Sequence, residues 1–270
     1  MEYLNRQASG ISETLWELID SAACSAARSL LTGRKFLSMD GAYGLGLTAL
    51  ELGADKIAHI ENHEASVVMG RAVSVPMLRR SCLMSIRRIQ AHLHMGQPLD
   101  LSPIETAAEA VARLEETLIY YGNSEFGLEG LMNAVGSANV AVGDWHQLDE
   151  AVNDVLAAVN TLDQSGFHGP YALSMSPYLY NKLFRRYECT NMLQLEHLRR
   201  LCEGGLFKAP IEGAVLVDPH AGVLVLGQDL ATGFTINDGV HYHMFAVESL
   251  VLKLQEPKAI CTLSATNANK

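Results

Sequence analysis

A glycine-rich stretch, DGAYGLGLTA at residues 40–49, has the spacing of a dinucleotide-binding loop. Gly44, Gly46 and Ala49 fit the pattern G-x-G-x-x-G/A, and Glu64 follows 20 residues after Gly44. Such a loop binds the pyrophosphate of NAD at the N-terminus of a helix that opens at the second glycine. Here another glycine interrupts seven residues later, and the pattern that follows is strand-like. A soluble NAD-dependent oxidoreductase using Gly44 and Gly46 is therefore kept only as an alternative hypothesis.

Two pairs of histidines have the spacing that places side chains on one face of a strand. These are His92 with His94 and His241 with His243. On a strand either pair could supply two metal ligands. A site needs a third or fourth ligand, and the sequence does not identify one. We therefore predict that both pairs lie on solvated or interfacial surfaces and that no metal site is present.

The residue types of nucleophilic catalysis occur without their motifs. The chain has no G-x-S-x-G, no H-E-x-x-H and no Walker loop. Cys189, in the polar stretch RRYECTNM, is interpreted as an ordinary loop thiol. The lack of a convincing catalytic site in 270 well-patterned residues favours a binding or structural role without a cofactor.

The charge and the distribution of apolar residues exclude several classes of protein. Twenty basic against thirty acidic residues give a net charge of −10, which disfavours binding to nucleic acid. The N-terminus lacks the basic and apolar regions of a secretory signal, and no run of 18 apolar residues could span a membrane. Five widely separated cysteines suit free thiols in a reducing cytoplasm.

Hydrophobic periodicity predicts the elements that must position any site. Apolar residues at helical spacing predict helices over about residues 12–31 and 102–121. Ser102 and Glu105 form a capping box at the start of the second helix, and Gly122 ends it. Further helices are predicted at 148–162, 177–186 and 193–205, strands at 34–40, 170–176, 242–255 and 259–263, and a strand pair at 214–227 with a turn at 219–222. This order favours an α+β fold.

Residues 54–76 have a strand-like, amphipathic pattern that is rich in charge. They offer too little apolar surface to form a core of their own. We therefore expect an extended arm or a long hairpin here.

Several segments of the chain resemble one family of shell proteins. They are MEYLNR, LLTGRKFLSMDGAYG, GLEGLMN, GPYALSMSP, LCEGGLFKAP and LGQDLATGF, in this order from Met1 to about Leu263. These segments are similar to the encapsulins, earlier described as linocin-type bacteriocins. The resemblance implies the tailed-phage major capsid fold (Hong Kong 97-type). It also implies self-assembly into a hollow icosahedral compartment in the cytoplasm. The enclosed cargo, such as a ferritin-like protein or a dye-decolorizing peroxidase, would dock a targeting peptide on the inner wall.

The resemblance also implies a division into domains. It assigns 1–32 to an N-terminal helical segment on the inner wall, 33–53, 77–122 and 220–265 to a peripheral domain, 54–76 to an extended intersubunit loop, 123–219 to an axial domain and 266–270 to a polar tail. An arm without its own core would then be buried by another subunit. An acidic chain suits a protein-filled shell better than a DNA-packing capsid.

By the same resemblance, two sets of residues form sites. The cargo-peptide dock comprises Ala27, Leu30, Arg34, Phe36, Ser38, Asp40, Leu230 and Phe234. If residues 34–40 form a strand, Arg34, Phe36, Ser38 and Asp40 share one of its faces. A loop over about 185–192 would approach the five-fold axis, where a pore would be lined by Glu188, Cys189 and Thr190. Some family members bind a flavin through a tryptophan near the position of Ile86. This chain has none there, so no such cofactor is expected.

Overall fold

The computed structural model describes residues 2–53, 55–59, 66–147, 149–186 and 192–264. The chain divides into two compact units, and each has its own sheet. Unit 1 comprises Met1–Leu31, Asp40–Glu115 and Val225–Val251, and unit 2 comprises Thr32–Met39, Glu116–Leu224 and Leu252–Lys270.

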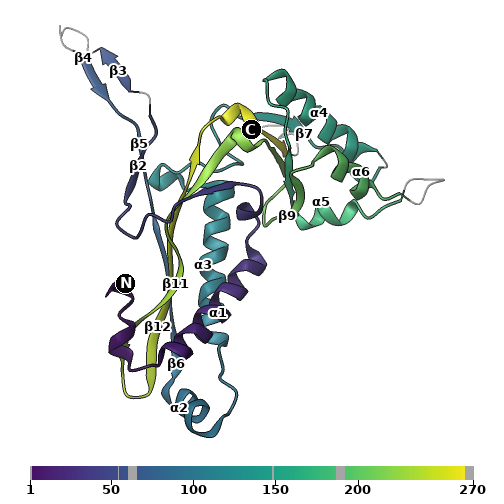
Figure 1. The fold of residues 1–270 in the computed structure, drawn as a ribbon. Helices are drawn as coiled ribbons and strands as arrows, with labels where there is room; N and C mark the ends of the chain where they lie inside the picture. Colours follow the sequence, from purple (N-terminus) through teal and green to yellow (C-terminus); the bar gives the residue numbers. More distant parts are fainter. Residues whose placement is uncertain (1, 54, 60–65, 148, 187–191, 265–270) are drawn as a thin grey trace. The chain divides into compact units, whose positions relative to one another are not determined.

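The sheet that holds most of the strands of unit 1 has the order β1-β11-β12-β6 (Figure 1). Its strands are β1 (Ser38–Asp40), β11 (Gly222–Asn237), β12 (His241–Leu254) and β6 (Met77–Ser85). β12 and β6 are antiparallel, with His241 opposite Ser85 and Ser249 opposite Met77. On one face of β12, Phe245 and Val247 form a small core with Leu4 of the N-terminal segment. Burying these apolar side chains stabilises the position of the N-terminus.

Three helices belong wholly or largely to unit 1: α1 (Glu13–Leu30), α2 (Ile86–Met95) and α3 (Ser102–Tyr121). The bounds of α1 and α3 confirm the two long helices predicted from periodicity. Each helix buries one apolar stripe, which includes Leu15, Ile19 and Ala23 on α1 and Ile104, Ala108 and Val111 on α3. This is the arrangement expected of amphipathic helices that cover a sheet.

The start of α3 differs from the predicted capping box. Ser102 is already helical, and its backbone N–H and its Oγ donate to Asp100 Oδ1 at 3.1 and 2.6 Å. These hydrogen bonds lower the pKa of the Asp100 carboxyl, because they stabilise its ionised form. Asp100 therefore caps the helix, whereas Gly122 follows its last residue as predicted, with φ +62°.

The described part of residues 49–74 forms a two-stranded antiparallel ribbon in unit 1 (Figure 1). β2 (Ala49–Glu51) pairs with β5 (Ala72–Ser74), and β3 (Lys56–His59) pairs with β4 (Ser66–Met69). This confirms the expected arm or long hairpin, apart from residues 54 and 60–65, which lie outside the described part.

Both faces of the ribbon carry exposed apolar side chains. Ile57 lies opposite Val68, and Val67 lies opposite Ala58. Successive residues of a strand point to opposite faces, so Val67 and Val68 cannot share one. Ile57 is 63% exposed and Met69 is 69% exposed. The ribbon therefore has apolar surface that the chain itself does not cover.

Unit 2 is built on a five-stranded sheet in the order β7-β13-β10-β8-β9. Its strands are β7 (Ala138–Ala141), β13 (Ile260–Ser264), β10 (Ala214–Val217), β8 (Ala172–Met175) and β9 (Gly205–Lys208), and its helices are α4 (Glu150–Gln164), α5 (Pro177–Lys182) and α6 (Gln194–Leu201). β10 is antiparallel to β8 and β13, whereas β13 with β7 and β8 with β9 are parallel. Trp145, Val155 and Leu162 are buried in its core together with residues of the sheet.

The predicted strand pair at 214–227 is wrong in its pairing. β10 already has β8 on one edge and β13 on the other, so it has no free edge for the segment that follows. A 3-10 turn, Pro219–Ala221, instead leads the chain into β11 of the other sheet. The mixture of helices with mainly antiparallel strands confirms the α+β class. No helix in the described part of the chain is long and apolar enough to cross a membrane.

Candidate assembly and peptide-docking surfaces

The glycine-rich segment after β1 does not open a helix. Among the described residues, Gly44 and Gly46 are followed by β2, and Gly44 N–H donates to the Gly227 carbonyl at 2.5 Å. A Cβ at Gly41 would collide with a backbone oxygen of β11. Glu64 lies outside the described residues. The glycines therefore allow close approach to β11, and the geometry of a dinucleotide loop is missing.

His92 and His94 lie on helix α2 rather than on a strand. Residues two apart on a helix point in different directions, so this pair cannot supply two ligands to one metal ion. His92 Nδ1 lies 2.8 Å from the Gln97 carbonyl, and His94 Nε2 lies 3.0 Å from Gln90 Oε1. Both rings thus take part in local hydrogen bonds.

His241 and His243 share one face of β12, as predicted, and both lie near Asp238. Asp238 Oδ2 lies 2.8 Å from His243 Nε2 and 3.9 Å from His241 Nδ1. Its Oδ1 accepts the backbone N–H groups of Val240 and His241 at 2.8 and 2.6 Å. These bonds, first the one from His241, hold the pKa of Asp238 well below its usual value. In the described part of the chain, no three His, Cys, Asp or Glu side chains are grouped to hold a metal ion.

Three of the described cysteines are poorly suited to nucleophilic catalysis. Cys24, Cys82, Cys202 and Cys261 are free thiols. Burial raises the pKa of Cys82 and Cys261 to about 11 and that of Cys202 to about 12. The thiolate is the nucleophile, so Cys82, Cys202 and Cys261 are poor nucleophiles near neutral pH. Cys189 lies outside the described residues.

One buried carboxylate of unit 2 orients a histidine as catalytic dyads do. Asp218 is 1% exposed, and its Oδ1 lies 2.7 Å from Nδ1 of the exposed His220. Asp218 also accepts Gly169 N–H at 2.9 Å. No Ser or Cys side chain hydrogen-bonds to His220 within the described ranges, so the nucleophile of a triad is missing. Through its hydrogen bond from Gly169, Asp218 connects the β10–β11 turn to the segment before β8.

The predicted strand at 34–40 is wrong over its first half. Arg34 lies in a 3-10 helix, Gly33–Lys35, and Phe36 follows it with φ −130° and ψ −22°. Only Ser38 and Asp40 lie in β1. The four side chains therefore do not share one strand face.

A buried glutamate explains this bend. Glu116 accepts the N–H groups of Thr32 and Gly33 at 2.8 and 2.9 Å and forms a short hydrogen bond with Thr32 Oγ1. Tyr120 Oη lies 3.0 Å from Thr32 Oγ1 and donates to Ser174 Oγ at 2.9 Å. A side chain on Gly33 would collide with Ile119. These contacts between residues far apart in sequence hold the chain in a turn where local alternation predicts a strand.

The predicted docking residues differ in exposure and are divided between the units. Ala27, Leu30, Asp40, Leu230 and Phe234 belong to unit 1, and Arg34, Phe36 and Ser38 belong to unit 2. Ser38 and Asp40 are exposed, Leu30, Arg34, Phe36 and Leu230 are half-buried, and Ala27 and Phe234 are buried at 3% and 5% exposure. Phe36 packs against Phe207 with ring centroids 5.4 Å apart, and Phe234 packs against Tyr242 at 5.9 Å. The pore candidates Glu188, Cys189 and Thr190 lie outside the described residues.

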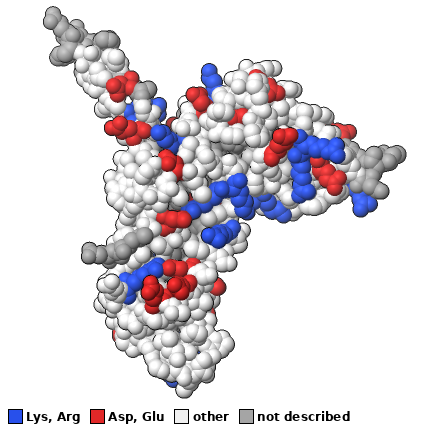
Figure 2. Space-filling view, in the orientation of Figure 1, with Lys and Arg blue, Asp and Glu red and all other residues white. Residues whose placement is uncertain are grey.

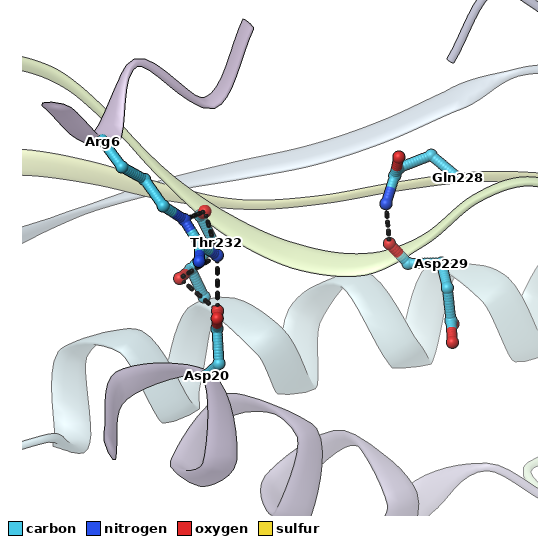
Figure 3. Close-up of polar contacts among 5 residues, drawn as sticks. All are labelled: Arg6, Asp20, Gln228, Asp229 and Thr232. Carbon is cyan, nitrogen blue, oxygen red and sulfur yellow. Dashed lines mark hydrogen bonds and ion pairs between the residues drawn. The ribbon is translucent and has the colours of Figure 1, made fainter. Parts of the chain in front are cut away.

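A polar cluster at the N-terminus was not found from sequence. Figure 3 shows Arg6 reaching Asp20 of α1 and Thr232 of β11. Arg6 Nη2 lies 2.8 Å from Asp20 Oδ1 and donates to the Thr232 carbonyl at 2.8 Å, while Thr232 Oγ1 donates to Asp20 Oδ1 at 2.7 Å. The guanidinium also lies over the Trp16 ring, 4.8 Å from its centroid. Asp20 and Thr232 are 14 and 226 positions away from Arg6 in the sequence. Such separations give no periodic pattern from which the cluster could be predicted.

The face drawn in Figure 2 carries side chains of both charges. Acidic and basic side chains lie beside one another there.

The fold of this chain, with its two sheets, helix α3 and ribbon, is that of capsid proteins. The virus-like particle of Pyrococcus furiosus has the same fold, with a TM-score of 0.73 and 21% identity over 93% of this chain and 99% of that one. The capsid of Myoviridae phage XM1 gives a TM-score of 0.60 and 15% identity over 86% and 90% of the two chains. These likenesses confirm the tailed-phage major capsid fold.

Sequence comparison identifies the family within this class. A family model described as "encapsulating protein for peroxidase" matches residues 1–251. A type 1 encapsulin shell protein of Myxococcus xanthus is 28% identical and covers 100% of this chain and 99% of its own length. A diheme-cytochrome-encapsulin shell fusion protein of Kuenenia stuttgartiensis is 32% identical over 94% of this chain and 73% of its own. The chain belongs to the type 1 encapsulin family, and it is a subunit of an icosahedral shell.

Proposed function

We propose that this subunit encloses a cargo protein by binding a targeting peptide on the inner wall of its shell, and that it has no catalytic role of its own. The single observation that carries the proposal is the match to shell proteins over the whole chain. The fusion of a diheme cytochrome to a shell in Kuenenia stuttgartiensis supports the association of such shells with a second protein. We place the particle in the cytoplasm.

The uncovered ribbon supports the assembly role of residues 49–74. Ile57, Val67, Val68 and Met69 are all exposed in the isolated chain. Exposed apolar side chains on both faces of a ribbon suit burial by neighbouring subunits. We accordingly assign the ribbon to the extended intersubunit loop, 123–219 to the axial domain and the capped helix α3 to the peripheral domain.

The candidate docking residues remain the predicted set, and exposure ranks them within each unit. Leu30, Phe36 and Leu230 are half-buried and can offer apolar contact, while Ser38 and Asp40 can offer polar contact. Ala27 and Phe234 are buried, so they support the surface rather than form it. An extended peptide with a few apolar anchors suits such a surface.

The test is co-purification of a cargo with intact particles. Particles from the wild type and from Phe36→Asp and Leu30→Asp variants are compared by negative stain and by the cargo retained per particle. We expect hollow particles in all three and loss of cargo in the variants. Because a buried charge can destabilise the fold, particle formation is the control. Full loading of both variants would show that this surface is not the dock.

A further inference from the structure

A short helix of unit 2, α5, carries aromatic and basic side chains next to one another. Tyr178 is 64% exposed, and Lys182, one turn later, lies over its ring with Nζ 4.1 Å from the ring centroid. Phe184, just beyond the end of the helix, is 54% exposed. Rings with this exposure keep part of their flat faces in contact with solvent.

A second pair of lysine and tyrosine joins α5 to the edge strand β9. Lys208 of β9 has its Nζ 4.9 Å from the ring centroid of Tyr180 and donates to Asn181 Oδ1 at 3.0 Å. Tyr180 in turn packs against Phe184, with ring centroids 5.8 Å apart. These contacts connect the two pairs into one surface. We call it the α5 surface and define it by Tyr178, Tyr180, Lys182, Phe184 and Lys208.

A third cation lies at the edge of the α5 surface. Arg185 is exposed, and its guanidinium donates to the His146 carbonyl. His146 Nε2 lies 3.2 Å from Tyr178 Oη, and the two rings meet edge to face with centroids 6.3 Å apart. A guanidinium has several N–H donors, so Arg185 keeps donors that a ligand can use.

The α5 surface is positively charged, although the chain as a whole is acidic. Residues 176–186 and 205–211 include four Lys or Arg and no Asp or Glu. Figure 2 shows Lys and Arg side chains gathered over the region of α5, α6 and β9. At physiological ionic strength, exposed charges more than about 8 Å apart are largely screened from one another. The local charge, rather than the net charge of −10, therefore decides what binds here.

Interleaved rings and cations match the chemistry of a single-stranded nucleic acid. Proteins bind such strands without sequence preference by stacking the bases on aromatic side chains and by pairing the phosphates with Lys and Arg. A duplex keeps its bases stacked inside, so it offers this surface only phosphates. An acidic protein segment would pair with the cations but has no use for the exposed ring faces.

We propose that the α5 surface binds single-stranded nucleic acid without sequence preference. Bases stack on the open faces of Tyr178 and Phe184, and phosphates pair with Lys182, Arg185 and Lys208. This assigns to unit 2 a ligand of a different class from a cargo protein. It does not depend on the docking residues given under the proposed function.

The experiment supplies three fluorescein-labelled probes to the full-length subunit. They are a deoxythymidine strand of about 20 nucleotides, its duplex with a deoxyadenosine strand, and an oligoglutamate of about 20 residues. The subunit is refolded from urea with each probe, so that both faces of a shell are accessible, and the particles are then purified. The probe retained per subunit is titrated at about 50 and about 200 mM NaCl.

Four proteins are compared with the wild type. Lys208→Glu reverses a charge of the α5 surface, and Lys258→Glu reverses that of an exposed lysine elsewhere in unit 2 and is the matched control. Tyr178→Ala removes a ring, and Tyr178→Phe keeps it.

We expect the wild type and the control to retain the single strand at least about fivefold better than the duplex or the oligoglutamate. Three phosphate contacts predict that the apparent affinity falls about 20-fold between the two salt concentrations. Lys208→Glu should weaken binding and flatten this salt dependence. Tyr178→Ala should weaken binding about fivefold or more, whereas Tyr178→Phe should bind like the wild type.

Several outcomes overturn the proposal. If the wild type retains the oligoglutamate as well as the single strand, the surface binds acidic protein segments instead. Equal effects of Lys208→Glu and Lys258→Glu, wild-type binding by Tyr178→Ala, or no retention of any probe by the wild type also refute it. Failure of Lys208→Glu alone to form particles would identify the surface as a contact between subunits. None of these outcomes bears on cargo loading, which the Phe36→Asp and Leu30→Asp variants test.

Discussion

Arg6 and Asp20 hold the N-terminal segment against helix α1, with Arg6 Nη2 2.8 Å from Asp20 Oδ1. Both side chains are about two-thirds buried, and Thr232 of β11 bonds to each of them. One guanidinium thus joins the N-terminal 3-10 turn, α1 and β11 (Figure 3). This cluster fixes the N-terminal half of α1 against β11.

Removing Arg6 should destabilise the subunit. Arg6→Ala removes the donor to the Thr232 carbonyl and leaves Asp20 with Thr232 Oγ1 as its remaining donor in this cluster. Hydrogen bonds to charged groups contribute about 1.5–3 kcal/mol. We expect a lower urea midpoint, measured at one protein concentration because assembly makes apparent stability concentration-dependent. The control is Arg28→Ala, which removes an exposed arginine of α1. It should change the free energy of unfolding by less than about 0.5 kcal/mol. Equal midpoints for the two variants would contradict the role of Arg6.

Replacing Glu116 by glutamine should lower the free energy of unfolding much less than replacing it by alanine. Glu116→Ala leaves the buried N–H groups of Thr32 and Gly33 without acceptors, at a cost of about 1–3 kcal/mol for each. In Glu116→Gln the amide oxygen can accept both N–H groups while the amide nitrogen donates to Thr32 Oγ1. Unfolding free energies of the two variants test this. A Gln variant as unstable as the Ala variant would show that the negative charge, rather than the hydrogen bonding, is needed.

Local sequence predicted the elements whose contacts are local. The stripe of Leu15, Ile19 and Ala23 identified α1, and the charged alternation of residues 54–76 identified the ribbon. Asp100 replaced Ser102 as the cap of α3, a shift of two residues that periodicity does not resolve. Sequence patterns of this kind indicate which residues are apolar, but not which distant partner covers them.

The errors arose where distant residues decide the local structure. Residues 34–36 alternate like a strand, yet Glu116 and Ile119 hold the chain before them in a turn. The sequence predicted that β10 pairs with the strand that follows it. Its actual partners, β8 and β13, lie far away in the sequence. The docking residues came from family resemblance alone, because no local pattern in the sequence identifies them.

Acidification should remove the contribution of Asp238 to stability. The folded state lowers the pKa of Asp238 below the ordinary 3.8, so the ionised carboxylate stabilises the β11–β12 turn above that pH. The contribution should fall as the pH drops below 3.8 towards the lowered pKa. We expect Asp238→Asn to lower the urea midpoint at pH 7 and to approach the wild type only as the pH falls below about 3 towards the lowered pKa. A difference between Asp238→Asn and the wild type that stays constant as the pH falls would refute the assignment.

The ribbon offers the most direct test of assembly. Val68 is 57% exposed in the isolated chain, so a lysine there should leave the folding of the subunit unchanged. Burial of such a side chain by a neighbouring subunit would contribute about 1.5–3 kcal/mol per subunit, and a lysine would lose it. We expect Val68→Lys to shift the protein from particles to small species in size-exclusion chromatography. Ser66→Lys adds the same charge to the same face of β4, two residues away, and should retain more particles. If both variants assemble like the wild type, this face of the ribbon is not buried in the shell.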